Sequence, residues 1–144
     1  MKYTNEVKFT FPAKSANEAF ARGAVAAFIM QLDPTVGELS DIKTSVSEAV
    51  TNCIVHGYKG QKGLIYISLK ISEDNVVTIK IRDKGCGIED IEKAMEPLFT
   101  TAGDERAGLG FAVMQSFMDS IRVSSKLSKG TTVTLKKKIV KDDP

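Results

Sequence analysis

The sequence predicts an α/β protein of the α+β type, a two-layer sandwich with helices on one face of a mixed, mostly antiparallel sheet. Two long helical patterns follow each other early in the chain, and two pairs of β-rich segments come later. The members of each pair are separated by only a short turn, which is the signature of a hairpin. Hairpins join antiparallel strands, whereas a doubly wound parallel sheet requires strands and helices in alternation.

The chain is expected to begin with a strand and a helix. Residues 6–11 alternate polar and apolar side chains, as a half-buried strand does, and Pro12 ends the pattern. Ser15 and Glu18 have the spacing of a capping box. An alanine-rich amphipathic helix should therefore start at Ser15 and run to about Leu32.

A second helix is expected to follow at once. Asp33 suits its N-cap and Pro34 its first turn, where the missing N–H group of proline costs nothing. The apolar pattern continues to about Val55, and Gly57 suits the C-terminal stop.

The second half of the chain predicts two hairpins with helices and a loop between them. Residues rich in β-branched side chains form four expected strands: 64–71, 75–82, 121–127 and 131–140. Between the hairpins, residues 88–95 predict a short helix and residues 96–107 a loop, because no period holds there. Residues 108–119 predict a third long helix.

Length and composition indicate one globular domain spanning residues 1–144. The net charge of +2 is too small to indicate a nucleic-acid surface. No segment has the apolar length of a membrane span or the pattern of a signal peptide, so we expect a cytoplasmic protein whose Cys53 and Cys86 are reduced. Two cysteines and one histidine do not make a zinc site.

One face of the second helix carries side chains that could take part in binding or catalysis. Glu48, Asn52 and His56 are successive i,i+4 neighbours, so they stack along one line. An amide oxygen is a hard ligand suited to Mg²⁺, and a carboxylate one turn away can accept a proton. The alternative is a solvated face, although such faces usually carry lysine and glutamate.

Two glycine-containing loops follow this helix. Asp83 ends a strand, and Gly85 and Gly87 come after it, which would let the backbone approach a planar ligand closely. Gly108 and Gly110 open the third long helix, whose N-terminus would favour phosphate. Each loop alone also fits an ordinary turn, and the signal lies in the order of all these motifs.

This order of motifs resembles the GHKL group of ATPases and kinases, which share the Bergerat fold. Residues 48–57 resemble the N box of that group, residues 83–87 and 108–110 its two glycine boxes, and Gly130-Thr131 its late threonine. Within the group, the chain is similar over nearly its whole length to the anti-sigma serine kinases of spore-forming bacteria. The most specific matches are residues 17–22, 26–29, 31–35, 47–52, 56–58 and 97–101.

The resemblance implies a role for each matching residue. Glu48 would be the catalytic base, Asn52 the Mg²⁺ ligand, and Asp83 with Thr131 the adenine contact. Residues 96–107 would form an ATP lid; Ala102 stands where a basic residue is expected, which leaves Arg106 as the candidate cation. The remaining expected nucleotide contacts are His56, Gly85, Gly87, Thr100, Thr101, Gly108, Leu109 and Gly110.

The resemblance also implies partners. A homodimer would bind ATP or ADP with Mg²⁺, hold a sporulation sigma factor inactive, and phosphorylate an anti-anti-sigma antagonist on serine. Arg22 would touch both proteins, and neither nucleic acid nor a membrane would be bound directly. The alternatives are a stress-response anti-sigma serine kinase, a histidine-kinase catalytic domain, and a module that binds ATP without turnover.

Overall fold

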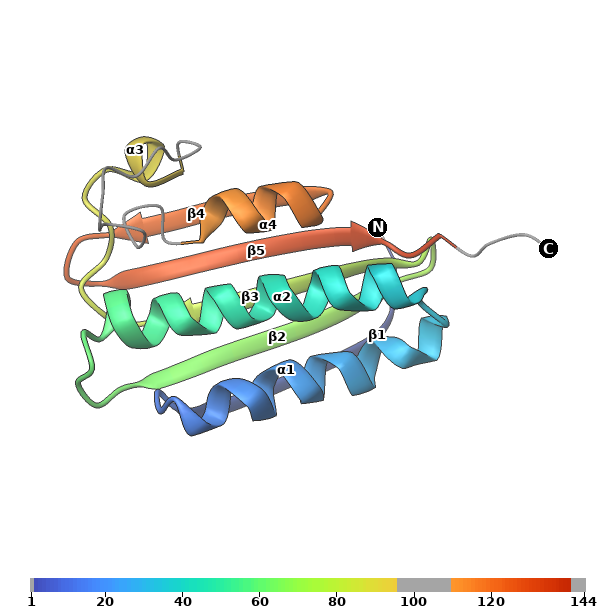
Figure 1. Ribbon diagram of the computed structural model, residues 1–144, viewed down its shortest axis with the longest axis horizontal. Helices are drawn as coiled ribbons and strands as arrows, with labels where there is room; N and C mark the ends of the chain where they lie inside the picture. The colour runs from blue at the N-terminus through green and yellow to red at the C-terminus, as the bar shows by residue number, and fades with distance from the viewer. Residues whose placement is uncertain (1, 96–109, 141–144) are drawn as a thin grey trace.

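The structure is a computed structural model that describes residues 2–95 and 110–140 (Figure 1). The described part of the chain contains five strands, four α-helices, a 3₁₀ helix (Met30–Leu32) and a π-helical turn (Cys53–Gly57). The strands are β1 (Tyr3–Pro12), β2 (Leu64–Ser72), β3 (Val76–Asp83), β4 (Ser120–Lys126) and β5 (Gly130–Lys138). The helices are α1 (Ala16–Ile29), α2 (Val36–Asn52), α3 (Ile91–Met95) and α4 (Phe111–Phe117).

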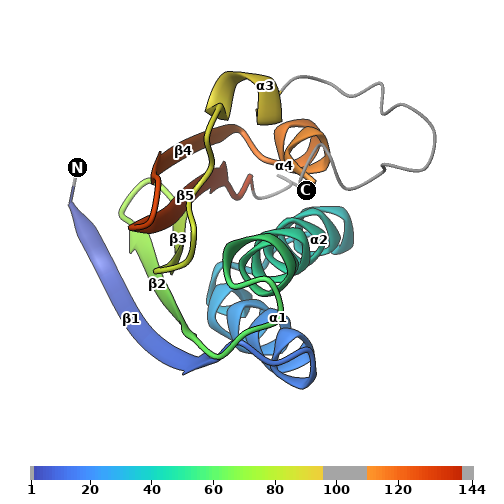
Figure 2. The same cartoon turned by 90° about the vertical axis from the view of Figure 1, so that its left-hand side faces the viewer.

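The strands form one sheet in the order β1-β2-β3-β5-β4. Each of its neighbouring pairs is antiparallel, which confirms the expected hairpins; the sheet of the described residues is wholly antiparallel and not mixed. Both α1 and α2 lie against the same face of the sheet (Figure 2). The two-layer sandwich predicted from the sequence is therefore the observed architecture.

The core lies between the helices and the sheet. Alternate residues of β2 and β3, such as Ile67 and Ile79, are almost completely buried. Val25 on α1 and Val46 on α2 have no exposed surface and belong to the same hydrophobic cluster. Burial of these faces fixes which side chains of each strand point toward the helices and which point away.

The starts of the first two helices differ from the sequence prediction. Ser15 has helical backbone angles and its side chain makes no capping hydrogen bond, because a capping residue needs an extended backbone. Asp33 has a left-handed backbone, with φ 53°, and does not cap α2. The capping box is formed instead by Thr35 and Glu38, where both reciprocal bonds are present.

The helix ends also differ in detail. Helix α2 is regular to Asn52 and continues as a π-helical turn over Cys53–Gly57. Helix α3 is shorter than the expected 88–95, and α4 ends at Phe117 because the chain becomes extended at Met118 and enters β4. The expected loop 96–107 lies outside the described residues. No helix in the described ranges has both the length and the hydrophobicity that crossing a membrane requires.

Candidate functional site

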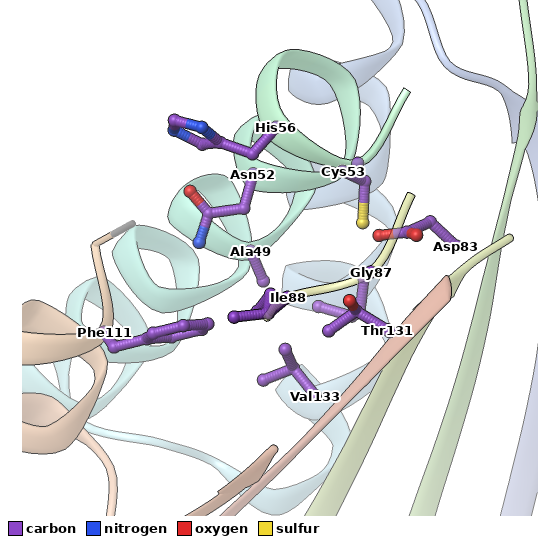
Figure 3. A pocket seen from close by; sticks show the side chains of 12 residues that line it. Ala49, Asn52, Cys53, His56, Asp83, Gly87, Ile88, Phe111, Thr131 and Val133 are labelled. Atoms are coloured by element: carbon purple, nitrogen blue, oxygen red, sulfur yellow. The ribbon is translucent and has the colours of Figure 1, made fainter. Parts of the chain in front are cut away.

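A pocket lies at the end of α2, where this helix faces β3, β5 and the start of α4 (Figure 3). Its volume is about 30 Å³, enough for water molecules and too small for a purine ring. The lining residues are Ala49, Asn52, Cys53, His56, Gly57, Ile81, Asp83, Gly87, Ile88, Phe111, Thr131 and Val133. Most of them are apolar, and the polar ones converge from α2, the turn that follows it, β3 and β5, as in many small-molecule sites.

Asp83 is the buried acid of this pocket, with a side chain only 4% exposed. Its Oδ1 accepts a hydrogen bond from the Gly85 N–H at 2.9 Å, and the Cys53 thiol points toward the same carboxylate (Figure 3). Among the described residues no cation pairs with it. Burial raises the pKa of Asp83, and hydrogen bonds from Gly85, Cys53 and the Thr131 backbone partly offset this effect.

The thiol of Cys53 is a hydrogen-bond donor in this arrangement. Burial raises the pKa of Cys53 well above its ordinary value, and the negative charge of Asp83 raises it further. The thiol therefore stays protonated at neutral pH and can donate to the carboxylate. Within residues 2–95 and 110–140 the donors to Asp83 are neutral groups, which leaves the carboxylate with capacity to accept from a ligand.

Glycines allow the chain segments around Asp83 to touch. A Cβ atom on Gly57 would lie 2.7 Å from the Asp83 carboxylate oxygen, and a Cβ on Gly85 would lie 2.1 Å from the Gly57 carbonyl oxygen. The Cys86 N–H donates to the same Gly57 oxygen at 2.9 Å. The π-helical turn after α2 and the loop after β3 are therefore in direct backbone contact, and side chains would separate them.

Tyr58 also holds the loop after β3 in place through hydrogen bonds of its hydroxyl. Its hydroxyl accepts from the Lys84 N–H at 2.7 Å and donates to the Leu64 carbonyl at 2.6 Å. The aromatic ring lies directly over Gly63, where a Cβ would be 2.4 Å from it. Tyr58 thus joins the end of α2 to the start of β2 and the end of β3.

Thr131 lies beside Asp83 because β3 and β5 pair in a register that places these residues opposite each other. The Thr131 hydroxyl is 2.8 Å from Ser125 Oγ, which also donates to the Gly130 carbonyl. Ser125 accepts the Ile88 N–H at 2.8 Å. One serine therefore links the β4–β5 hairpin to the loop that follows Asp83.

Glu48 stands one turn before Asn52, close to the start of α4. Gly110 caps α4 with a left-handed backbone, φ 69°, and a Cβ there would lie 2.4 Å from Glu48 Oε2. The glycine therefore lets the helix start approach the carboxylate. This places the expected base beside the helix N-terminus that was expected to face phosphate.

Glu48 also lines a groove of about 300 Å³ between α1 and α2 that contains Arg22. The other lining residues are Val36, Leu39, Ser40, Lys43, Thr44 and Ser47. Arg22 is oriented by Glu18, with Nη2 and Oε2 3.7 Å apart, and Glu18 in turn accepts the Ser47 hydroxyl. The two residues expected to meet a partner protein thus share one surface depression.

The donor set fits a nucleotide-bound magnesium ion rather than a protein-only metal site. The described residues contain no cluster of three or more His, Cys, Asp or Glu side chains. Asn52, which lines the pocket, supplies a carbonyl oxygen of the kind Mg²⁺ accepts. Magnesium usually takes few protein ligands and completes its shell with phosphate oxygens and water.

The structure gathers most of the residues expected from the sequence. Those found around the pocket and its rim are Glu48, Asn52, His56, Asp83, Gly85, Gly87, Gly110 and Thr131. Arg22 lies in the adjoining groove. Thr100, Thr101, Arg106, Gly108 and Leu109 lie outside the described residues.

Sequence reasoning missed the groups that complete the site. The apolar wall formed by Ile88, Phe111 and Val133 has no motif of its own. The sequence predicts a reduced Cys53 on the apolar side of the second helix, but not its hydrogen bond to Asp83. The hairpin turn at residues 128–130 places Ser125 opposite Thr131, so this pairing was available from the sequence.

Comparison with known sequences identifies the family of the chain. Residues 11–137 match the histidine kinase-like ATPase domain family. The anti-sigma F factor of Thermoanaerobacter sp. strain X514 is 58% identical over 143 residues, which are 99% of each chain. That of Clostridium botulinum strain Alaska E43 is 58% identical over 94% of this chain and 96% of the relative. That of Geobacillus kaustophilus strain HTA426 is 56% identical, over 95% and 94%.

Solved structures share the fold. The crystal structure of the RsbU and RsbW domains of a Mycobacterium tuberculosis protein has a TM-score of 0.67 at 19% identity, covering 94% of this chain and 33% of that one. The histidine kinase domain of a blue-light activated kinase from Erythrobacter litoralis has a TM-score of 0.57 at 17% identity, covering 85% and 60%. The chain belongs to the histidine kinase-like ATPase domain family and, within it, to the anti-sigma F factors.

Proposed function

We propose that this chain is an ATP-dependent anti-sigma factor that binds and inhibits the sporulation factor sigma F and phosphorylates a serine of its anti-anti-sigma antagonist. The carrying observation is the position of Glu48, which lies between the start of α4 and the groove of Arg22. A base in that place can reach a hydroxyl presented by a docked protein while a nucleotide occupies the neighbouring pocket.

Asp83 would recognise the adenine ring. Its carboxylate has neutral hydrogen-bond donors on the protein side and can accept a further bond from an exocyclic amine. Thr131, opposite Asp83, would add a hydroxyl to the same edge of the ring. Because the pocket holds only about 30 Å³, a purine would enter with an outward shift of wall residues such as Ile88 or Phe111.

Asn52 would hold Mg²⁺ against the phosphates. When bound, the metal ion would neutralise negative charge on the transferred phosphoryl group. The N-terminal end of α4, which starts at Gly110, would present backbone N–H groups on the same side. The lid expected over residues 96–107, including Arg106, belongs to this proposal and lies outside the described residues.

Transfer would use Glu48 as general base. A serine hydroxyl of the antagonist would lose its proton to the Glu48 carboxylate as its oxygen bonds to the γ-phosphorus. The bond from that phosphorus to the β–γ bridging oxygen would break, and ADP would leave. Positioning of the two reactants would supply most of the rate enhancement, with the base adding about 10²–10⁴-fold.

The groove between α1 and α2 would receive the protein partners. Arg22 is held by Glu18 yet keeps 41% of its side chain exposed, so its guanidinium remains available to a carboxylate or backbone carbonyl. Lys43 adds a second cation to the same groove. Sigma F and its antagonist would compete for this surface, and a cytoplasmic homodimer would present it twice.

Substitution of Glu48 by glutamine tests the catalytic role. With labelled ATP and the purified antagonist, Glu48→Gln should lower phosphoserine formation by about 10²–10⁴-fold, because the amide cannot accept the proton. Affinity for ATP and for sigma F should change by less than about twofold, since the side-chain shape is kept. The matched control is Glu73→Gln at the exposed β2–β3 turn. Normal phosphorylation by the Glu48 variant would refute its assignment as the base.

Two alternatives make different predictions in the same assay. A binding module without turnover would transfer no label from the unmodified chain, although it would bind ATP. A histidine kinase would label itself on the single histidine, His56, which lines the pocket. Co-purification with sigma F rather than a stress-response sigma factor would identify the pathway.

A further inference from the structure

The face of the sheet that points away from α1 and α2 is a second functional candidate (Figure 2). It is curved, and residues from all five strands line one depression of about 580 Å³. The lining residues are Tyr3, Ser68, Lys70, Thr78, Lys80, Ser120, Arg122, Ser124, Thr132, Thr134 and Lys136. We call this set the open face. It contains four cations, hydroxyl groups, one aromatic ring and no carboxylate.

The strand register arranges the cations in rows across the sheet. Ser68 lies opposite Lys80, Lys80 opposite Thr134, and Thr134 opposite Arg122. Lys8 of β1 extends this row on the other side of Ser68. Cations therefore alternate with hydroxyl groups, and successive cations are about 10 Å apart because neighbouring strands are about 4.8 Å apart.

A second row one pleat along also alternates cations and hydroxyl groups, but its member on β1 is Glu6, opposite Lys70. Thr78 lies opposite Lys70 on one side and opposite Lys136 on the other. Thr78 is only 9% exposed, and its Oγ1 is buried without a hydrogen-bond partner among the described residues. A buried hydroxyl without a partner is uncommon in native proteins.

The charge of the open face is almost uncompensated. Lys70 pairs with Glu6, with Nζ and Oε2 3.5 Å apart, and this is the one ion pair there within residues 2–95 and 110–140. Lys80, Arg122 and Lys136 have no carboxylate partner in those ranges. A second copy of the same face would bring like charges together, so self-association through it is unfavourable.

We propose that the open face docks an acidic segment of a partner protein. Carboxylates match the alternation of cations and hydroxyl donors, and the guanidinium of Arg122 suits a carboxylate in particular. Single-stranded nucleic acid would need free aromatic platforms. The Lys70 Nζ already lies over the Tyr3 ring, 4.7 Å from its centroid, and the Lys84 Nζ lies over the nearby Tyr66 ring at 4.9 Å. A flat anionic membrane would not enter a depression.

This surface is separate from the proposed anti-sigma activity. The nucleotide pocket and the groove of Arg22 are lined by residues of α2 and its neighbours. Helix α2 lies on the other side of the sheet from the open face (Figure 2). An acidic partner on the open face would therefore bind together with ATP and with a protein in the groove. The proposal does not depend on whether the chain is a kinase.

The test measures binding of a fluorescein-labelled oligo-glutamate peptide to the full chain by anisotropy at about 0.15 M salt. The double variant Lys80→Glu with Arg122→Glu should weaken binding by about tenfold or more. The control Lys14→Glu with Lys62→Glu makes the same charge change at exposed loop positions and should stay within about twofold of the unmodified chain. If the charge-reversal variant does not fold, the double variant Lys80→Gln with Arg122→Gln replaces it in the same assay.

Three results would overturn the proposal. The first is an equal loss in both double variants, which would mean that only net charge attracts the peptide. The second is no measurable binding of the peptide by the unmodified chain at that salt concentration. The third is tighter binding of a single-stranded oligonucleotide or of phosphatidylglycerol vesicles than of the peptide. Unchanged ATP affinity in the Lys80 and Arg122 variant would confirm that the open face acts separately from the nucleotide pocket.

Discussion

At the scale of single residues, Asp83 combines a functional demand with a cost to the fold. An ionised carboxylate would serve adenine recognition, yet the described part of the chain buries it beside neutral donors and without a paired cation. Burial disfavours the charged form, and this is why its pKa is raised. Cys53 and Gly85 reduce the cost, and they do so without neutralising the charge that a ligand would use.

The cost predicts a pH dependence of stability. In the folded chain the pKa of Asp83 lies above the ordinary 3.8. Between pH 3.8 and this raised pKa, the folded state therefore binds more protons than the unfolded state. Its contribution to the free energy of unfolding therefore falls as pH rises through this interval and becomes constant above the raised pKa. Urea titration gives the free energy of unfolding of Asp83→Asn and of the unmodified chain. The first minus the second should rise steadily with pH over the same interval.

Only the slope of that difference is predicted, because the amide changes the local hydrogen bonds by an amount that does not vary with pH. Asp33→Asn is the matched control, since Asp33 is exposed and asparagine tolerates its left-handed backbone. A flat difference for Asp83→Asn would show that burial does not penalise the ionised form.

At the scale of elements, the two helix starts show how local signals compete. Ser15 and Glu18 have the same spacing as Thr35 and Glu38, but only the second pair forms a capping box. The Glu18 carboxylate instead accepts a tertiary hydrogen bond from Ser47 on α2 and forms an i,i+4 ion pair with Arg22 within α1. Glu38 also accepts the Val140 N–H at 2.9 Å, so the second box is reinforced by the end of the chain.

Alanine substitutions should separate the two caps. Thr35→Ala should lower the free energy of unfolding by about 0.5–2 kcal/mol, because the Glu38 N–H loses its side-chain acceptor. Ser15→Ala should change it by less than about 0.5 kcal/mol, because the hydroxyl makes no capping bond. Chemical denaturation of both variants gives the comparison, and an equal effect of the two substitutions would contradict it.

The start of α4 predicts a second pair of substitutions. Gly110→Ala should destabilise the fold by about 1–2 kcal/mol from the left-handed backbone alone, and it should disturb Glu48, which a Cβ would contact. Phosphotransfer should fall with it. Gly23→Ala, in α1 with no atom near the new Cβ, should instead stabilise by about 0.5–1 kcal/mol.

Urea titrations and the phosphorylation assay measure both effects of these glycine substitutions. A stable and fully active Gly110→Ala chain would mean that phosphotransfer does not depend on the close approach of α4 to Glu48.

At the scale of the whole molecule, the pocket is a meeting point of the fold. Its walls come from α2, the π-helical turn, β3 with the loop that follows it, β5 and the first residue of α4. Tyr58 and Ser125 tie the loops around it to β2 and to the β4–β5 hairpin. A ligand there contacts segments that span most of the sequence.

Nucleotide binding should therefore stabilise the chain as one unit. Mg·ATP at about 100 times its dissociation constant should raise the free energy of unfolding by about 2.7 kcal/mol, as linkage requires for a ligand of the folded state only. The urea transition should move as a single step. Two separate transitions, of which only one responds to Mg·ATP, would contradict the assembly of the pocket from the whole fold; magnesium without nucleotide is the control.

The sequence by itself determined the class of fold and the order of the motifs. Alternation in residues 64–71 and 75–82 predicts strands because the side-chain period of a strand is local, and the short turn between them requires antiparallel pairing. Glu48, Asn52 and His56 could be placed on one face for the same reason, since helical spacing depends only on the residues of the helix. These local patterns were enough to indicate a nucleotide site and its family.

Only the tertiary structure decided which remote residues touch. The pairing of β3 with β5 sets Thr131 beside Asp83 and sets Lys80, Thr134 and Arg122 in one row of the open face. Because α1 packs on α2, the Glu18 carboxylate accepts a hydrogen bond from Ser47 and does not form a capping box. Such contacts depend on the register between strands and on the approach of helices, which are settled by burial of the common core and leave no local pattern in the sequence.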